Sequence, residues 1–292
     1  MTERVLLGLV GAGIRASLSP ALHEREAERL GVHALYQTID IAERDLPPEA
    51  VGDIVAAART MGFAGLNVTH PCKQTVLEHL DELSADAAAL GAVNTVVFGP
   101  GGRTVGHNTD GTGFAASFAR GLPDAELRRV VLLGAGGAGA AVGHAALSLG
   151  AERLTVVDVD ADRAAGLARS LETQFDEGRA DHAGPDDLPA LLERASGLIH
   201  ATPTGMAHHP GLPLDPDLLN PDLWVADIVY RPLETELLRC AREVGCRTLD
   251  GGGMVVLQAA ASFALFTGLE PDRERMLRHF ARLVEAPALA AG

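Results

Sequence analysis

The sequence has 292 residues, of which 47% are hydrophobic, with a mean hydropathy of +0.13 and a formal net charge of −15. This length and apolar content are enough for one large or two modest globular domains. The acidic balance excludes a protein that tracks nucleic-acid phosphates, since such proteins need a net basic face. The three cysteines do not form a disulfide framework, and we expect free thiols, as in a reducing compartment.

The sequence predicts neither export nor insertion into a membrane. The first residues carry one acidic and one basic side chain before a short apolar run, with no cleavage-type site. The longest apolar run, Met254–Phe266, is interrupted by Gln258 and Ser262 and is too short to span a bilayer. We therefore expect a cytoplasmic protein that binds neither membranes nor nucleic acid.

Short β-branched runs alternate with amphipathic Ala/Leu-rich segments, which is typical of βαβ units and parallel sheets. The fold class is therefore α/β. Two further runs, Asn94–Val97 and Thr104–His107, predict a hairpin around the turn at residues 99–102 and hence a mixed edge in the first half. The other strands are expected near Val5–Val10, Ala34–Ile39, Gly65–Thr69, Val130–Gly134, Leu154–Asp158, Gly197–Ala201, Leu223–Asp227 and Arg247–Leu249.

The order of these segments predicts two domains. A polar, turn-forming segment at Leu122–Leu127 precedes a fresh strand and a glycine loop. After the last strand, a long helix follows Asp250–Gly253, and its apolar faces need a partner, so the C-terminal helices are expected to return to the first domain. We predict a discontinuous first domain, residues 1–110 with 255–292, and a second domain, residues 111–254. The alanine-rich tail after Val284 is expected to fray.

Two segments match the glycine fingerprint for phosphate binding, Gly11–Ala16 and Gly134–Gly139. Pyrophosphate needs the backbone N–H groups of a helix that begins directly at the loop. The second loop is followed at once by a helix-compatible stretch, whereas the helix after the first loop is expected to begin only at Pro20, with Ser19 as its N-cap. The second loop is the predicted dinucleotide site, and a simple tight turn is the alternative for both loops.

Asp158 ends the second predicted strand of the dinucleotide unit. An acidic side chain at this place accepts hydrogen bonds from the adenosine ribose hydroxyls, which favours NAD and disfavours NADP. A 2′-phosphate about 4 Å from the carboxylate would be repelled by roughly 4 kcal/mol per charge pair at an effective dielectric constant near 20. Arg163 is placed to neutralise this repulsion, yet Asp160 and Asp162 keep the turn negative. The alternative is that Asp158 only caps a loop.

Lys73 and Asp110 are the candidate acid/base pair. An alcohol loses hydride to a nicotinamide only if another group takes its hydroxyl proton. Lys73 is expected at the start of a helix, after the strand at Gly65–Thr69 and the sharp exit at His70-Pro71. Taken alone, Lys73 is also explained as a solvated surface charge and Asp110 as a helix N-cap.

Other polar residues are candidates for the substrate site. Ser17 and Ser19 project their hydroxyls the same way and are able to grip a carboxylate, unless they only cap the helix and solvate the loop. Polar side chains at strand ends or inside an apolar run need partners if they are buried. These are Asn67, Thr69, Asn94 and Gln258.

No metal site is expected. Near Lys73, His70 and Cys72 are the only pair of potential soft ligands, and nothing completes a tetrahedral set. For Cys72 itself, a reactive thiol and a small core-filling side chain are both open.

Several strings that occur in one order resemble the shikimate dehydrogenase family, from about Val5 to about Leu283. The resemblance implies a two-domain α/β enzyme that interconverts a ring alcohol and a ketone. An N-terminal mixed α/β substrate domain would face a Rossmann-type doubly wound parallel sheet across an interdomain active-site cleft. The strings are Ser17-Leu-Ser-Pro20, Asn67-Val-Thr-His-Pro-Cys-Lys73, Gly91-Ala-Val-Asn-Thr95, Asn108-Thr-Asp110, the loop Gly134–Gly139, Ala201-Thr-Pro-Thr-Gly-Met206, Asp227-Ile-Val-Tyr230, and Asp250-Gly-Gly-Gly-Met254 with Gln258.

The resemblance also implies roles for individual residues. Ser17 and Ser19 would hold the substrate carboxylate, and Lys73 and Asp110 would be the acid/base pair. The ring hydroxyls would be bonded by Asn67, Thr69, Asn94, Tyr230 and Gln258. The cofactor would lie against Gly134, Gly136, Gly137, Ala138, Gly139, Thr202, Pro203, Ile228 and Gly251.

Two features depart from the NADP-linked biosynthetic members. Asp158-Val-Asp160 stands where those members resemble Asn-Arg-Thr, and Gly11-Ala-Gly-Ile14 stands in place of Gly-Asn-Pro-Ile. Both are similar to the NAD-dependent quinate/shikimate dehydrogenase branch. The expected substrates are therefore hydroxylated cyclohexane or cyclohexene carboxylates, quinate or shikimate, and their 3-dehydro ketones. The alternatives are an NADP-dependent shikimate dehydrogenase of aromatic biosynthesis, with Arg163 on the 2′-phosphate, and a non-catalytic dinucleotide-sensing protein. Assembly into a homo-oligomer is open.

Overall fold

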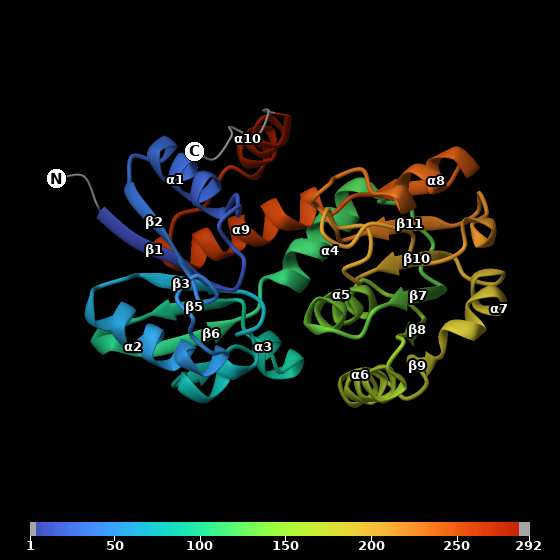
Figure 1. Cartoon of the computed structure of the whole chain (residues 1–292), viewed down its shortest axis with the longest axis horizontal. Coiled ribbons are helices and arrows are strands. Elements are labelled where there is room, and N and C mark those ends of the chain that lie inside the picture. The colour runs from blue at the N-terminus through green and yellow to red at the C-terminus, as the bar shows by residue number, and fades with distance from the viewer. Residues whose placement is uncertain (1–3, 286–292) are drawn as a thin grey trace. The chain divides into compact units, whose positions relative to one another are not determined.

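The computed structural model describes residues 4–285, so the first three residues and the tail beyond residue 285 lie outside it. The described chain forms two compact units (Figure 1). The first unit ends at Thr109 and resumes at Val256, and the second is Asp110–Val255. Each unit is a six-stranded sheet with helices packed against it, which confirms the predicted α/β class.

The sheet of the first unit has the order β2-β1-β3-β5-β6-β4. Strand β1 pairs in parallel with both β2 and β3, whereas β5 is antiparallel to β3 and to β6. The predicted hairpin is therefore present and gives this sheet its mixed edge. The strands are β1 (Arg4–Gly11), β2 (His33–Asp40), β3 (Gly65–Val68), β4 (Glu82–Leu83), β5 (Thr95–Phe98) and β6 (Thr104–His107).

Apolar side chains cover both faces of this sheet because successive residues of a strand point to opposite sides. On β1, Val10 packs with Val51 and Val55 of α2 on one face. Leu7 and Leu9 belong to the opposite face, where α1 and α9 supply the covering side chains. The helices of the unit are α1 (Ser19–Arg29), α2 (Val51–Thr60), α3 (Ala85–Leu90), α9 (Gly252–Thr267), which starts in the second unit, and α10 (Arg273–Glu285).

The sheet of the second unit is parallel throughout, with the order β12-β11-β10-β7-β8-β9. Counted from β7, this is the doubly wound strand order 3-2-1-4-5-6 of dinucleotide-binding folds. Ligands of such sheets bind at the carboxyl ends of the strands, beside the point where the order reverses. The strands are β7 (Arg129–Leu133), β8 (Arg153–Val157), β9 (Ala180–Ala183), β10 (Gly197–His200), β11 (Trp224–Asp227) and β12 (Arg247–Leu249).

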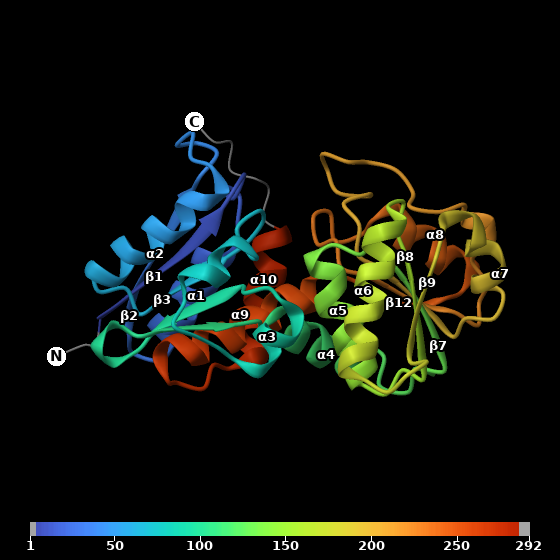
Figure 2. The same cartoon turned by 90° about the horizontal axis from the view of Figure 1, so that it is seen from below.

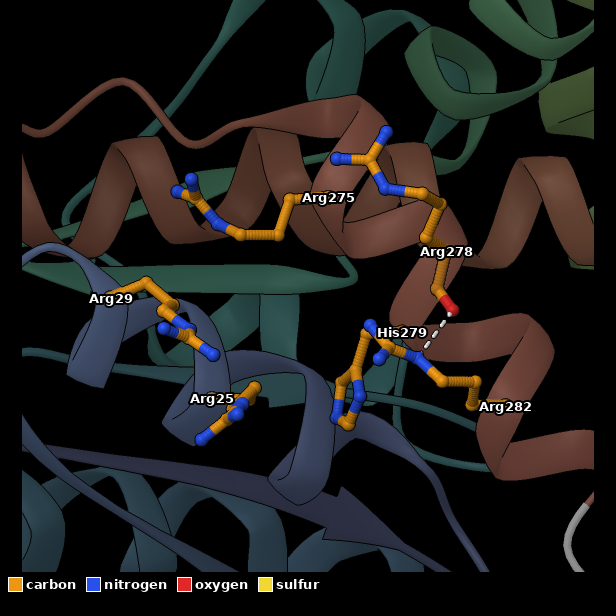
Figure 3. Close-up of a pocket in the computed structure, with 6 residues that line it drawn as sticks. All are labelled: Arg25, Arg29, Arg275, Arg278, His279 and Arg282. Carbon is orange, nitrogen blue, oxygen red and sulfur yellow. Dashed lines mark hydrogen bonds between the residues drawn. The ribbon is translucent and has the colours of Figure 1, made fainter.

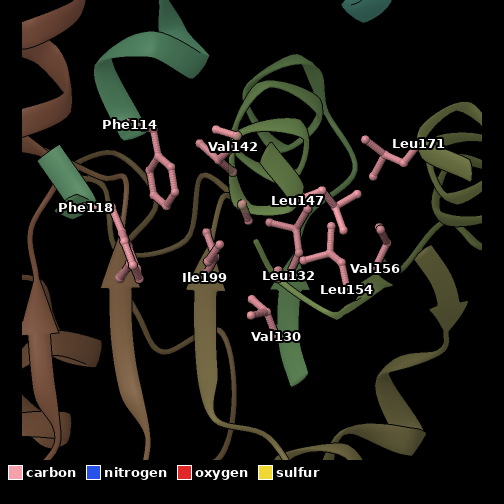
Figure 4. Packing of buried hydrophobic residues seen from close by; sticks show 14 of the residues in the cluster. Phe114, Phe118, Val130, Leu132, Val142, Leu147, Leu154, Val156, Leu171 and Ile199 are labelled. Carbon is pink, nitrogen blue, oxygen red and sulfur yellow. The ribbon is translucent and has the colours of Figure 1, made fainter. Parts of the chain in front are cut away.

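Helices cover both faces of the second sheet (Figure 2). On β7, Val130 and Leu132 face the cluster formed with α4, α5 and α6, which Figure 4 shows in close-up. Val131 and Leu133 face the other cluster, formed with α7 and α8. The helices are α4 (Asp110–Gly121), α5 (Gly137–Ser148), α6 (Ala161–Gln174), α7 (Leu188–Leu192) and α8 (Glu236–Val244).

Ten of the twelve strands in the described part lie where the sequence predicts them. The two that the prediction missed, β4 and β9, are edge strands of their sheets. Strand β4 has two residues, and β9 contains no β-branched or aromatic residue. Neither has the local pattern of a strand, so their existence depends on the neighbouring strand.

Candidate active site

The predicted substrate residues of the first unit gather at one edge of its sheet. Ser17 and Thr69 follow the carboxyl ends of the parallel strands β1 and β3. Asn94 precedes β5, and Thr109 follows β6, at the same edge because β5 runs antiparallel to both neighbours. Backbone hydrogen bonds join these segments, including Thr69 N–H to the Val10 carbonyl and Asn94 N–H to the His107 carbonyl.

Ser17 and Ser19 lie at the start of α1 with their hydroxyl oxygens 3.2 Å apart. The expectation that Ser19 is the N-cap is wrong, because Leu18 holds that position and Ser19 is the first helical residue. The Ser17 hydroxyl accepts from the Ser19 backbone N–H at 3.2 Å, which fixes the turn. Two adjacent half-buried hydroxyls result, and such a pair is suited to the two oxygens of a carboxylate.

Behind Ser19, buried side chains form a continuous hydrogen-bonded array. Tyr36 of β2 is hydrogen-bonded to Ser19, and its hydroxyl donates to Asn67 Oδ1 of β3 at 2.7 Å. The amide nitrogen of Asn67 donates to Thr95 Oγ1 at 3.1 Å and to the Asn94 carbonyl at 3.3 Å. Burial raises the pKa of Tyr36 far above its ordinary value, so its hydroxyl remains a donor.

The array continues to helix α9. Thr95 Oγ1 donates to Asn94 Oδ1 at 2.9 Å, and Asn94 Nδ2 donates to Thr109 Oγ1 at 2.9 Å. Thr109 Oγ1 then lies 3.4 Å from Gln258 Oε1 in α9. Gln258, predicted only from its place in an apolar run, thus joins the same array as Ser17 and Asn67. The two ends of the array are half-buried and its middle is buried.

Lys73 lies in the turn after the cis peptide His70–Pro71. The expectation that it starts a helix is wrong, since the next helical segment is the short 3₁₀ helix Thr75–His79. Its backbone carbonyl accepts from Val93 N–H at 2.8 Å, which ties Lys73 to the segment that carries Asn94. Lys73 is also the only lysine in the sequence.

Asp110 and Tyr230 belong to the second unit. Asp110 is buried and is the first residue of α4, directly after Thr109, whose N–H donates to Asn94 Oδ1 at 2.8 Å. Tyr230 lies in the loop after β11. Their participation beside Lys73 and the substrate residues stays a prediction.

The second glycine loop has the geometry of a pyrophosphate cradle. Gly134 has a φ of +103°, which only glycine adopts without strain, and α5 begins at Gly137 with no side-chain cap. A Cβ on Gly139 would come within 2.0 Å of the Gly134 carbonyl oxygen, so helix and strand approach as closely as glycine allows. A Cβ on Gly136 or Gly137 would meet nothing within 4 Å, so space is open before the helix N-terminus. These residues fit a dinucleotide pyrophosphate.

Asp158, directly after β8, braces this loop. Its Oδ2 accepts from Ala135 N–H at 2.8 Å, and its Oδ1 accepts from Asp160 N–H at 2.9 Å and from Arg163 at 3.0 Å. Burial alone would raise the pKa of Asp158, but these amides and the Arg163 charge hold it below the ordinary value. The loop-capping role, stated above as an alternative, is therefore present. A carboxylate has about four acceptor positions, so one is left for a ribose hydroxyl.

The first glycine loop is closed by a carboxylate of its own. Asp40 accepts from Gly13 N–H at 3.1 Å and from Ile14 N–H at 2.8 Å. Desolvation raises the pKa of Asp40, but the amide hydrogen bonds outweigh it and hold the pKa below the ordinary value. Amides that would face a phosphate are thus occupied by an internal anion, and the helix α1 begins eight residues after Gly11.

The remaining predicted cofactor residues follow β10 and β11. Thr202 and Pro203 come just after β10, Ile228 comes just after β11, and Gly251 packs against the Ile228 carbonyl. Together with Gly134 and Asp158, these predicted cofactor residues lie along the carboxyl edge of one parallel sheet. Beneath Thr202 lies a buried pair that the sequence analysis missed, His200 and Asp227, with Nδ1 and Oδ1 2.9 Å apart.

Cys72 is fully buried in the core of the first unit. Burial raises the pKa of its thiol, and the nearby Glu49 carboxylate adds to this effect. Since the thiolate is the reactive form, this favours core filling over reactivity. Among residues 4–285, no helix is long and apolar enough to cross a membrane.

Comparisons with known proteins match this arrangement. Residues 9–96 match the model of the shikimate dehydrogenase substrate binding domain, and residues 251–279 match that of the shikimate 5′-dehydrogenase C-terminal domain. A shikimate dehydrogenase (NADP(+)) from Streptomyces avermitilis is 64% identical over 287 residues, 98% of each chain. The chain belongs to the shikimate dehydrogenase family.

The similar members of the shikimate dehydrogenase family include proteins named for NADP(+) and proteins named for NAD(+). A quinate/shikimate dehydrogenase (NAD(+)) from Corynebacterium efficiens is 47% identical over 96% of this chain and 99% of its own. The structure of a quinate dehydrogenase from Corynebacterium glutamicum in complex with NAD has a TM-score of 0.92 at 43% identity, covering 96% of this chain and all of that one. The protein is an oxidoreductase that acts on CH–OH groups with a pyridine nucleotide.

Sequence reasoning missed Tyr36, Thr95 and Thr109 in the first unit, and His200 with Asp227 in the second. The composition could have drawn attention to Tyr36, since Tyr36 and Tyr230 are the only tyrosines of the sequence. It also supports Lys73, because all other Lys/Arg positions of this sequence hold arginine, which does not release its proton in proteins. Where a side chain must exchange a proton, arginine is unsuitable.

Proposed function

We propose that this enzyme oxidises the ring alcohol of quinate or shikimate with NAD and reduces the corresponding 3-dehydro ketone in the opposite direction. The observation that carries this proposal is the hydrogen-bonded array from Ser17 to Gln258. It offers a hydroxyl pair at one end and amides and hydroxyls along its length, which matches a molecule with one carboxylate and several ring hydroxyls.

In this proposal, the first unit binds the substrate. Ser17 and Ser19 hold its carboxylate through their adjacent hydroxyls. The array fixes the orientation of Asn67, Asn94 and Gln258 in advance, so these three lose little entropy on binding. The ring hydroxyls are bonded by these three and by two further polar side chains. These side chains are Asn67, Thr69, Asn94 and Gln258 of the first unit, with Tyr230 of the second.

Lys73 acts as the acid/base group, and Asp110 orients it. In the oxidation, the unprotonated ε-amine of Lys73 takes the proton of the substrate hydroxyl as the carbon–hydrogen bond releases its electron pair. In the reduction, the ammonium returns that proton to the ketone oxygen. The bound nicotinamide supplies the hydride acceptor or donor. This role is supported by the composition, since Lys73 is the only lysine and all other Lys/Arg positions hold arginine.

The dinucleotide binds to the second unit, with its pyrophosphate at the loop Gly134–Gly139. Thr202, Pro203, Ile228 and Gly251 line the remaining length of the cofactor. Asp158 retains one acceptor position for the adenosine ribose, and Asp160 adds a second negative charge beside it. Arg163 is engaged by both carboxylates, at 3.0 Å and 3.2 Å, and its charge is therefore largely neutralised. These charges favour NAD over NADP.

A second candidate is an NADP-dependent shikimate dehydrogenase of aromatic biosynthesis. The name of the Streptomyces relative, at 64% identity, favours it. In this case Arg163 would leave Asp158 and Asp160 to bind the 2′-phosphate.

Initial rates with each of NAD⁺ and NADP⁺ on each of quinate and shikimate test the proposal. We expect kcat/KM to be at least tenfold higher with NAD⁺. A preference for NADP⁺ would overturn the cofactor assignment and support the second candidate. Absence of turnover in all four reactions, with a folded protein, would overturn the substrate assignment.

A charge-conserving variant tests the role of Lys73. Lys73→Arg keeps the positive charge but cannot accept a proton, so we expect kcat to fall about a hundredfold or more with nearly unchanged dinucleotide affinity. The exposed Arg44→Gln is the control and should leave kcat unchanged. Reductive ¹³C-methylation would label a single lysine side chain, whose resonance should shift when the substrate binds.

A further inference from the structure

A basic cavity of about 290 Å³ lies between α1 and α10 in the first unit, and none of the residues that line it belongs to the substrate array (Figure 3). Its lining comes from two helices that are far apart in sequence. Figure 3 shows the side chains arranged around a common space. They are Arg25 and Arg29 of α1, and Arg275, Arg278, His279 and Arg282 of α10.

The spacing of these arginines is unfavourable without a partner. Arg25 and Arg29 are four residues apart on one helix face, and so are Arg278 and Arg282. Like charges at this spacing destabilise a helix. The protein carries a net charge of −15, so this concentration of arginines does not reflect a generally basic surface.

Two of the five arginines are held by carboxylates and form the frame of the cavity. Arg275 donates to the buried Glu26 at 2.6 Å and 2.9 Å and to Asp272 at 3.1 Å. Arg25 pairs with Glu28. Of these contacts, the one between Arg275 and Glu26 joins α10 to α1.

The other three arginines are less well compensated. Asp272, whose pKa is lowered chiefly by its hydrogen bond from the Arg275 N–H, also interacts electrostatically with Arg278. Within residues 4–285, no carboxylate makes an ion pair with Arg29, Arg278 or Arg282. All three side chains are exposed, and Arg282 donates only to the Arg278 carbonyl, at 3.2 Å. Positive charge is therefore in excess around the cavity.

The excess charge affects the pKa of His279, which is one of the residues that line the cavity. Burial lowers the pKa of its imidazole, a hydrogen bond to the Ala21 backbone opposes this, and the charges of Arg25 and Arg282 lower it further. An anion in the cavity would offset the two arginine charges and raise the pKa of His279.

We propose that this arginine cluster binds a small organic anion that carries a phosphate group. Planar guanidiniums match the oxygens of a phosphate in paired hydrogen bonds, and three arginines without an ion pair carry more positive charge than a single carboxylate would balance. The volume is at the lower end of small-molecule sites, which limits the ligand to a compact body. The site takes no part in the proposed dehydrogenase reaction.

An NMR titration of His279 with glycerol 3-phosphate tests this proposal on the full chain. His279→Gln identifies the imidazole resonance. We expect saturable binding that raises the pKa of His279, with at least tenfold weaker binding in the double variant Arg278→Gln/Arg282→Gln. The matched control Arg169→Gln/Arg194→Gln removes two exposed arginines of the second unit and should bind as the wild type does.

The loop Gly134–Gly139 is a second site at which a phosphate compound is expected to bind. The His279 resonance responds to binding in the arginine cluster and not at that loop, so the titration distinguishes the two sites. A titration that leaves the His279 resonance unmoved, or an equal shift with sodium chloride at the same ionic strength, overturns the proposal. So does unweakened binding in the Arg278→Gln/Arg282→Gln variant.

Discussion

The hydroxyl of Tyr36 lies 2.7 Å from Oδ1 of Asn67, although β1 runs between the strands that carry them. Both side chains are buried. The contact decides which way the Asn67 amide points, since its oxygen accepts from Tyr36 and its nitrogen must then donate to Thr95 and to the Asn94 carbonyl. Tyr36, which was not predicted from the sequence, therefore sets the direction of hydrogen bonding at Asn67, which was.

Tyr36→Phe removes the donor to Asn67 and leaves a buried amide oxygen unsatisfied. We expect the free energy of unfolding to fall by about 1–3 kcal/mol, measured by urea denaturation. The KM for the ring acid should rise several-fold while that for the dinucleotide stays the same, because Asn67 loses its fixed orientation. Thr173→Val, which removes an exposed hydroxyl, is the control. Equal stability and equal KM in Tyr36→Phe would refute the assigned role.

His23 makes stability depend on pH. Burial lowers its folded-state pKa from 6.5 to about 4, against the raising effect of its hydrogen bond to the Ser19 carbonyl. Between these values the unfolded chain takes up a proton that the folded chain does not. Stability is therefore full above pH 6.5 and falls as the pH drops towards 4, by about 3 kcal/mol in total from this group.

His23→Asn places an amide nitrogen near the position of Nδ1 and removes the titration. Urea denaturation of the variant and the wild type between pH 4 and 7 isolates the contribution of His23 from those of the carboxylates. We expect a shallower loss of stability in the variant. The exposed His33→Asn should keep the wild-type slope, and an unchanged slope in His23→Asn would contradict the prediction.

The pair His200–Asp227 anchors the loop that begins at Thr202. Asp227 Oδ1 accepts from His200 Nδ1, and Oδ2 accepts from Thr235 at 2.6 Å. His200 Nε2 is hydrogen-bonded to the Thr202 hydroxyl, at 2.5 Å. His200→Leu leaves a buried carboxylate short of a donor, so we expect a loss of about 3 kcal/mol in unfolding free energy. His182→Leu, at an exposed histidine, is the control.

A second variant separates this stability effect from cofactor binding. His200→Asn restores a donor near Asp227 but removes the hydrogen-bond partner of the Thr202 hydroxyl. We expect most of the stability to return, while the KM for the dinucleotide remains raised. If His200→Asn binds the dinucleotide as tightly as the wild type, the Thr202 contact does not position the cofactor loop.

Asp158→Asn tests the origin of cofactor preference. Removing the charge while keeping the side-chain shape should raise kcat/KM for NADP⁺ relative to NAD⁺ by about tenfold or more, because the repulsion of a 2′-phosphate is lost. Asp162→Asn removes one charge from the same turn without touching the glycine loop and should change the ratio much less. Equal ratios in both variants would show that Asp158 has no special part in selectivity.

Local sequence patterns predicted most of the fold. Short apolar, β-branched runs placed the strands, and the distance between each glycine loop and its following helix distinguished the predicted dinucleotide loop from the first loop. The structure adds the reason that Gly11–Ala16 differs, since Asp40 occupies its amides. Polar residues at strand ends likewise pointed to Asn67 and Asn94, which meet at one edge of the sheet because β5 runs antiparallel to β3.

The sequence by itself determined the order of the described strands except β4 and β9, the two α/β units and the polar residues at the strand ends, since periodicity and turn chemistry are local properties. Only the tertiary structure decided that Leu18 rather than Ser19 caps α1, that Lys73 lies in a turn, and that Tyr36 joins Ser19 to Asn67. These features depend on which strands become neighbours. Pairing between residues such as Tyr36 and Asn67, 31 positions apart, leaves no local pattern in the chain.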